Sequence, residues 1–168
     1  MHRKHHYHFF IPTVAITVAL LGGIFTEFGM QWYKNDLVLP AFVPPDWLFP
    51  IVWTVLYIMI AGAAYIVWHD GPKKVLHIFS THEAKVEYRL LQWAFVWNAF
   101  LNVLWTLLFF TLQWVALAAV EIVLLEISII MMIAFSWRIS KVAVMLLIPY
   151  AAWVLFATYL TMRIAFLN

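Results

Sequence analysis

The sequence of 168 residues contains no cysteine, and only 11% of its residues are charged. The absence of cysteine excludes disulfides, thiolate nucleophiles and thiolate metal sites, although it does not indicate a compartment. Soluble domains carry about 25% charged residues, and hydrophobic residues here make up 66% of the chain. The composition therefore indicates a multi-spanning membrane protein without a soluble portion large enough to hold a catalytic core.

Several functional patterns are also missing. There is no glycine-rich phosphate loop and no serine–histidine–acid arrangement that could assemble, and a net charge of +2 is too small to suggest a nucleic-acid partner. All seven histidines lie in the amino-terminal tail or in the polar connector that precedes the apolar part of the third helix, so haem ligation by histidine within the membrane is not expected, although methionine ligation stays open. Four histidines lie in the amino-terminal tail, namely His2, His5, His6 and His8. We interpret them as part of a basic flank near lipid headgroups rather than as a metal site. No metal centre is expected.

Apolar runs of about 20 residues, the length that crosses a bilayer, recur five times. They predict an all-α fold, an integral membrane bundle of five transmembrane helices in which residues 1–168 form one domain. The expected helices are 9–31, 46–68, 82–112, 114–136 and 141–167. Ser80 and Glu83 have capping-box spacing at the start of the third helix. Gln113 leaves so short a connection that the third and fourth helices must be antiparallel neighbours, and Pro149 would kink the fifth unless packed neighbours compensate.

The basic residues are distributed unequally between the two sides of this bundle. Eight lie on the side of the amino terminus, namely Arg3, Lys4, Lys73, Lys74, Lys85, Arg89, Arg138 and Lys141, against Lys34 and Arg163 on the other. The positive-inside rule then places the amino terminus inside and the carboxyl terminus outside. The membrane itself stays open, either a bacterial cell membrane or, in a eukaryote, the mitochondrial outer membrane. The aromatic loop between the first two helices lies outside, as an interfacial belt or as a lid over a cavity.

Three helices each present aromatic side chains with small or polar residues at helical spacing. The stripes are Trp53, Tyr57, Ala61, Ala64 and Trp68; Asn98, Asn102, Trp105 and Phe109; and Leu146, Tyr150, Trp153, Ala157 and Leu160. Any single ring is explained by packing alone, but three such stripes predict room for a flat ligand. Glu121 and Glu126 are about 140° apart on one helix, which excludes a paired-carboxylate hydrolase. Each is expected to bond a neighbouring helix, or one of the two to stay neutral in a low-dielectric environment, with a proton relay as the lesser alternative.

Three ordered motifs then resemble those of a known family. The third helix carries Asn102-x-x-Trp105-x-x-Leu108-Phe109-Phe110, and the fifth carries Pro149-Tyr150-x-x-Trp153-x-x-Phe156-Ala157-Thr158. The longest is Trp32-Tyr33-x-x-x-Leu37-x-x-Pro40-x-Phe42-x-Pro44-Pro45-x-Trp47-x-Phe49-x-x-Val52-Trp53-x-x-Leu56-Tyr57. Over about residues 9–168 the chain resembles the tryptophan-rich sensory protein/translocator protein family, also called the peripheral benzodiazepine receptor family. Ala61 departs from it by standing where a glycine is usual.

The resemblance implies a membrane receptor or sensor, a homodimer that binds tetrapyrroles such as protoporphyrin IX, and in some members cholesterol or benzodiazepine-type ligands. It implies no required cofactor, since porphyrin is the ligand. The family's pocket positions correspond to Trp53, Tyr57, Asn102, Trp105, Trp153 and Ala157. Asn102 is expected to hold a polar edge of the ligand, and Trp32, Tyr33 and Trp47 to close the mouth. Ala94 and Ala99 are expected to let two third helices approach each other.

Two other functions remain open from the resemblance. The first is light- and oxygen-dependent porphyrin degradation, for which Trp53 and Trp153 are the candidate catalytic residues because indole can donate an electron to an excited porphyrin. Enzyme status is therefore left undecided. The second is transport of porphyrin or cholesterol, for which the kinked fifth helix and the inner Glu121 and Glu126 are weak hints. Leu155, Tyr159 and Arg163 form a cholesterol-recognition pattern, but chance occurrence in a tyrosine-rich membrane protein is the favoured explanation of it.

Overall fold

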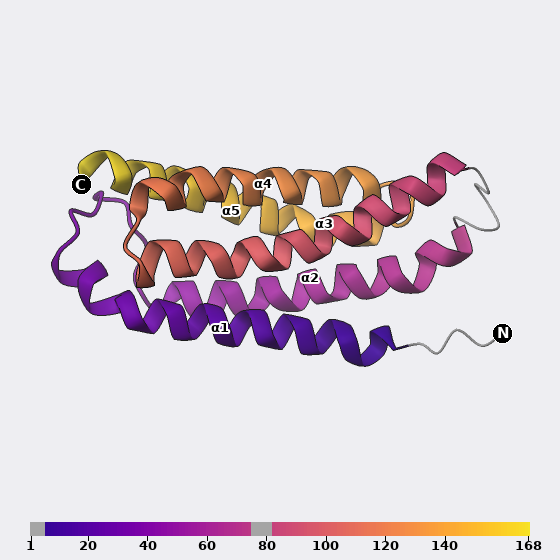
Figure 1. The fold of residues 1–168 in the computed structure, drawn as a ribbon, viewed down its shortest axis with the longest axis horizontal. Helices are drawn as coiled ribbons and strands as arrows, with labels where there is room; N and C mark the ends of the chain where they lie inside the picture. Colours follow the sequence, from indigo (N-terminus) through magenta and orange to yellow (C-terminus); the bar gives the residue numbers. More distant parts are fainter. Residues whose placement is uncertain (1–5, 75–81) are drawn as a thin grey trace.

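The computed structural model describes residues 6–74 and 82–168, which form five long helices (Figure 1). They are α1 (Tyr7–Asn35), α2 (Leu48–Lys73), α3 (His82–Thr106) with its π-helical continuation η2 (Leu107–Thr111), α4 (Val115–Ser136) and α5 (Lys141–Leu167). The described ranges contain no strand. Each of the five is long and apolar enough to cross a membrane. The predicted all-α membrane bundle of five helices is confirmed.

Three helices, α1, α2 and α3, differ from their predicted ranges by more than one residue. α1 continues to Asn35, where the Asp36 N–H still bonds to the Trp32 carbonyl. α2 begins at Leu48 and runs on to Lys73, through residues expected to form a connector. The α-helical part of α3 ends at Thr106, and the last predicted turn is π-helical. Ser80 of the predicted capping box lies outside the described residues. α2 thus still begins after the prolines Pro44 and Pro45, but it continues through the charged residues that suggested its end.

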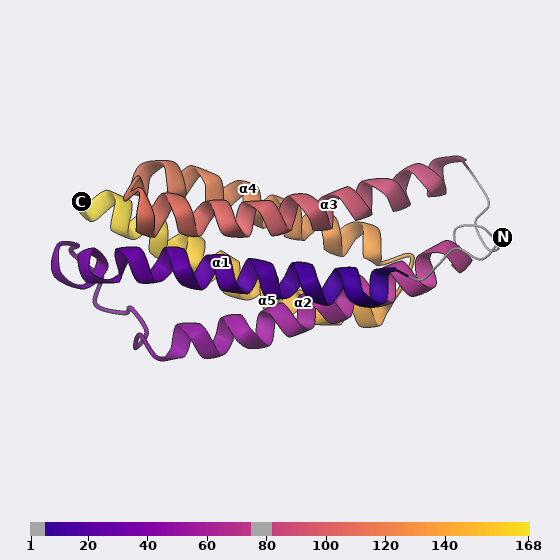
Figure 2. The same cartoon turned by 60° about the horizontal axis from the view of Figure 1, so that its bottom comes forward.

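The helices run alternately up and down and form a closed ring in the order α1, α2, α5, α4, α3 (Figures 1 and 2). α3 and α4 are antiparallel neighbours, as the short connection predicted. Gln113 achieves this reversal with a φ of 59°, in the left-handed region. α5 continues without interruption through Pro149, which is exposed on the outer surface of the bundle.

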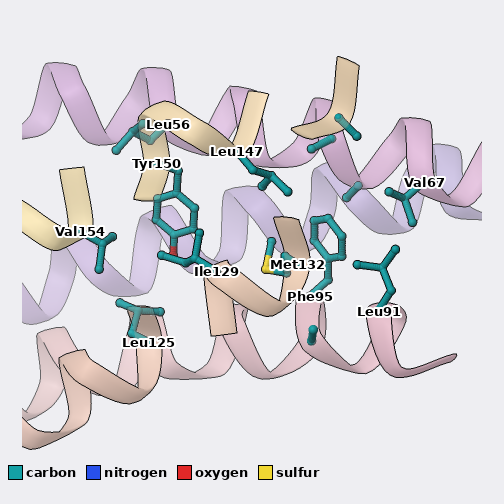
Figure 3. Close-up of a cluster of buried hydrophobic side chains, with 14 of the residues drawn as sticks. Leu56, Val67, Leu91, Phe95, Leu125, Ile129, Met132, Leu147, Tyr150 and Val154 are labelled. Carbon is teal, nitrogen blue, oxygen red and sulfur yellow. The ribbon is translucent and has the colours of Figure 1, made fainter. Parts of the chain in front are cut away.

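The core lies between α4 and its neighbours, and Figure 3 shows its side chains. Ile129 and Met132 of α4 are fully buried together with Leu91 of α3 and Leu147 of α5. Ala94 also belongs to this core, with 5% of its surface exposed. The expectation that Ala94 faces a second copy of the chain is therefore wrong, because the bundle itself covers it.

α1 approaches the rest of the bundle most closely at η2. A Cβ added at Gly29 would overlap the backbone carbonyl of Phe110, so only glycine permits this contact. The Thr111 hydroxyl fastens the same junction by donating to the Phe25 carbonyl at 3.1 Å. On its other side, α1 separates from α2 toward the end where residues 36–47 connect them (Figure 2). Residues of both helices line the main cavity.

Candidate functional site: an aromatic cavity among four helical elements

A cavity of about 400 Å³ lies between α1, α2, the α3–η2 junction and α5, and α4 contributes nothing to its wall. Its volume falls within the range of small-molecule sites. The aromatic members of the wall are Tyr33, Phe49, Trp53, Tyr57, Trp105, Phe109, Phe110 and Trp153. Gly22, Gly23 and Ala157 add little side-chain bulk to the same wall. This is a broad, mostly apolar space with ring surfaces on several sides.

The structure brings six of the nine sequence-predicted binding residues to this wall, namely Tyr33, Trp53, Tyr57, Trp105, Trp153 and Ala157. They belong to four elements, so their assembly depends on the fold. Trp53 stacks on Tyr57 with ring centroids 5.5 Å apart, and Trp105 stacks on Phe109 at 5.3 Å. Their faces are thus fixed by neighbouring rings before any ligand enters.

The other three predicted residues lie elsewhere. Trp32 packs edge-on against Phe109, with ring centroids 6.0 Å apart, and does not line the cavity. Trp47 stands just before α2 with 64% of its surface exposed. Of the described residues in loop 36–47, Asp46 alone lines the cavity. No aromatic side chain of loop 36–47 therefore lines this space, whereas Tyr33, at the end of α1, does.

Asn102, expected at the ligand's polar edge, belongs instead to a buried hydrogen-bond network. Its amide donates to the Tyr150 hydroxyl, which donates to Asn98 Oδ1 at 3.1 Å. The Asn98 amide in turn donates to Ser128 Oγ at 2.9 Å, so the network joins α3, α5 and α4. On the other side the Tyr57 hydroxyl lies 3.5 Å from Asn102 Oδ1. Asn102 does not line the main cavity itself, but its side chain meets the cavity wall at Tyr57.

A second, smaller cavity of about 150 Å³ lies between α1, α2 and α3. Asn98, Ala99 and Asn102 line it, together with Ala61, Ala64 and Trp68 of the α2 stripe. Tyr57 lines both cavities. The single stripe predicted on α2 is therefore divided, with Trp53 at one cavity, Ala61 to Trp68 at the other and Tyr57 between them. Ala99, unlike Ala94, is only partly buried, so its contact with a second third helix stays a prediction.

The edge of the main cavity carries charges that the sequence interpretation did not include. Glu27 and Asp46 line it, and Lys34 Nζ lies 3.0 Å from Asp46 Oδ2. Glu27 has no ion-pair partner in the described part of the chain. Glu27 and Lys34 lie close together on one helix, so the sequence could have placed both at the same end of the bundle. Nothing in the sequence indicated that Asp46 would contact Lys34.

Some buried polar groups in described residues have no partner. The indole nitrogens of Trp105 and Trp153, both in the cavity wall, have no hydrogen-bond acceptor. Both oxygens of Glu121 are also buried without a partner, so the expected bond from Glu121 to a neighbouring helix is not formed. Within residues 6–74 and 82–168, no three histidine or acidic side chains lie close enough to hold a metal. His2 and His5 fall outside those ranges.

The fold and this cavity define a class of protein, a small multi-pass membrane protein with a ligand-sized aromatic cavity inside its helix bundle. Residues 10–167 match the TspO/MBR family, and the chain belongs to that family. It is 41% identical over 156 residues to the tryptophan-rich protein TspO of Chlorobaculum tepidum, a match covering 92% of this chain and 91% of that protein. The translocator protein of Sus scrofa is 32% identical, with 89% and 86% covered. Protein CrtK of Rhodobacter capsulatus is 31% identical, with 82% and 78% covered.

Proposed function

We propose that this protein is a membrane receptor or sensor that binds a tetrapyrrole such as protoporphyrin IX in the main cavity. The observation that carries the proposal is the convergence of Trp53, Trp105 and Trp153 from three helices on one space of about 400 Å³. A porphyrin offers a broad apolar face for stacking on indoles and a carboxylate edge that must stay hydrated. Sterols and benzodiazepine-type molecules share the apolar face and are competing ligands for the same space.

The test is a titration of the detergent-purified protein with protoporphyrin IX in the dark, followed by tryptophan fluorescence and porphyrin absorption. Ala157→Phe places a ring in the cavity, and we expect it to weaken binding about tenfold or more because it occupies the ligand's volume. Trp153→Phe removes indole stacking surface, and we expect a smaller loss. Leu155→Phe is the matched control, because Leu155 lies on the outer surface of the same helix with 61% exposed. Equal affinities for all three variants and the unsubstituted chain would show that protoporphyrin IX does not bind in the main cavity.

A second candidate function is light-driven degradation of the bound porphyrin, with oxygen as oxidant. It is favoured by the position of two indoles, Trp53 and Trp153, in the cavity wall, where either could donate an electron to the excited ligand. The bound porphyrin would then lose its absorption in light and oxygen much faster than porphyrin in empty detergent micelles. Equal rates in the two samples would leave binding alone as the function.

Leu155 and Tyr159 of the cholesterol-recognition pattern do not line the main cavity. Leu155 and Tyr159 lie on the outer surface of α5 with 61% and 54% of their surfaces exposed, and Tyr159 stacks on Phe42 of loop 36–47. A sterol recognised by this pattern would lie against the outside of the bundle. Competition between cholesterol and protoporphyrin IX would instead indicate one shared cavity.

A further inference from the structure

We propose that Lys34 binds a carboxylate of the ligand and that Asp46 competes with the ligand for this ammonium group. The pair would then set how strongly the cavity prefers ligands that carry a carboxylate over neutral ligands of the same shape. This inference rests on the proposed function, because it requires a porphyrin-like ligand in the main cavity.

The first step is the position of the pair. Lys34 lies in the last turn of α1 and Asp46 two residues before α2, so their contact joins the two ends of loop 36–47. Asp46 lines the cavity, which places the ion pair at the cavity's edge. Both side chains are about half exposed, at 50% and 49%. A ligand whose rings occupy the cavity would have its hydrated edge beside this pair.

The second step is the charge of the cavity wall. Apart from tyrosines, the ionisable residues of the wall are two acids, Glu27 and Asp46, and no basic residue of the described ranges lines it. An anionic ligand therefore meets repulsion unless a cation is available. Lys34 and Arg163 are the basic residues at this end of the bundle. Arg163 lies over the exposed ring of Phe166, 6.0 Å from its centroid, and does not line the cavity. Lys34 does not line the cavity either, but its ion pair with Asp46, which does, brings its ammonium group to the cavity's edge.

The third step is the strength of the pair. Exposed ion pairs contribute little to stability, because water and salt screen them. A ligand carboxylate can therefore replace Asp46 as the partner of Lys34 by rotation of the side chains alone. A fully buried pair could not be exchanged in this way, since separating it would leave an uncompensated charge.

The fourth step is that the loop has other attachments. The Asn168 side chain accepts from the Val38 N–H at 2.9 Å and donates to the Val38 carbonyl at 3.1 Å. Phe42 stacks on Tyr159 with ring centroids 5.4 Å apart. Because these contacts do not involve the ion pair, removing either charge should leave the loop in place.

The experiment measures the affinities of protoporphyrin IX and of its dimethyl ester at low and at high ionic strength. The four proteins compared are the unsubstituted chain and the variants Asp46→Asn, Lys34→Gln and Arg163→Gln. We expect Asp46→Asn to bind the diacid more tightly and Lys34→Gln to bind it more weakly. Each change should be about fivefold at most, the range expected for an exposed ion pair. The ester should bind all four equally, which also reports that the cavity is intact. High salt should reduce these differences.

Arg163→Gln is the matched control, because it removes the other positive charge at this end without touching the cavity. Its diacid affinity should equal that of the unsubstituted chain. Saturable binding of both porphyrins with the same diacid-to-ester ratio in every variant would overturn this inference and leave the proposed function standing. An equal loss in Arg163→Gln and Lys34→Gln would also overturn it, since net charge alone would then explain the effect. If neither porphyrin bound saturably, both proposals would fail.

Discussion

Tyr150 joins α5 to α3 through one hydroxyl group in the middle of the bundle, and Asn98 extends this network to Ser128 of α4. The hydroxyl accepts from Asn102 and donates to Asn98, and the tyrosine is fully buried. The sequence could predict that Asn98 and Asn102 share a face, because they are one helical turn apart. It could not predict their partners, because these come from α4 and α5 and depend on the rotation of each helix in the ring. Asn102, which the sequence places at a ligand's polar edge, is hydrogen-bonded to Tyr150 within the protein, and its contact with a ligand stays a prediction.

Replacing Tyr150 with phenylalanine should destabilise the protein. The substitution keeps the ring but leaves Asn98 Oδ1 and the Asn102 amide without this partner in an apolar interior. The cost of unpaired buried groups is about 1–3 kcal/mol, although single hydrogen bonds between membrane helices average about 0.6 kcal/mol. We expect a loss of about 1 kcal/mol and a melting temperature lower by about 2–4 °C in detergent.

The matched control is Tyr159→Phe, at a tyrosine on the same helix with 54% of its surface exposed. It removes a hydroxyl outside the network, so its melting temperature should stay within about 1 °C of the unsubstituted chain, as for most surface changes. Equal melting temperatures for Tyr150→Phe and Tyr159→Phe would show that the network adds no net stability.

At the scale of elements, the contact between α1 and η2 holds one wall of the cavity. Its close approach depends on Gly29, which lies against the Phe110 backbone. The same contact explains why α1 runs beyond its predicted end, since Tyr33 packs against Phe109 and Phe110 of η2 with ring centroids 6.3 and 5.6 Å apart. Local sequence signals identified the helices, but contacts between distant segments decided where they end. The π-helical turn likewise has no local signal in the sequence.

Gly29→Ala should push α1 away from η2. Alanine favours helix over glycine by about 1 kcal/mol, but backbone atoms cannot move aside as a flexible side chain can. We expect a net destabilisation of about 1–3 kcal/mol, typical of overpacking, measured by thermal unfolding. Gly23→Ala is the control on the same helix, because nothing lies within 4 Å of its added Cβ. Gly23→Ala should be neutral or stabilising, and an equal loss in both variants would contradict the close contact.

At the scale of the whole molecule, three stripes that looked alike in sequence have different surroundings. Residues of all three line the main cavity, yet Asn102 and Ala61 line the second one and Tyr150 is enclosed by the core. Helical spacing predicts which residues share a face, but not how far along the bundle each cavity extends. The likeness to a family was readable from the sequence because its motifs are long and ordered. The charged edge of the cavity was not, because Lys34 and Asp46 meet across a loop.

The orientation of the whole bundle decides which compartment the main cavity faces. The eight-to-two distribution of basic residues predicts that loop 36–47, and the cavity edge at Asp46, lie on the outer side. The lack of cysteine permits a direct test, since a single introduced cysteine is the only thiol. Val38→Cys and His82→Cys place thiols at exposed positions on opposite ends of the bundle. In sealed bacterial spheroplasts, a membrane-impermeant maleimide should label only Val38→Cys, whereas both variants should react once the membrane is permeabilised. Labelling of only His82→Cys in the sealed sample would reverse the orientation, so that ligands would enter the cavity from the cytoplasmic side.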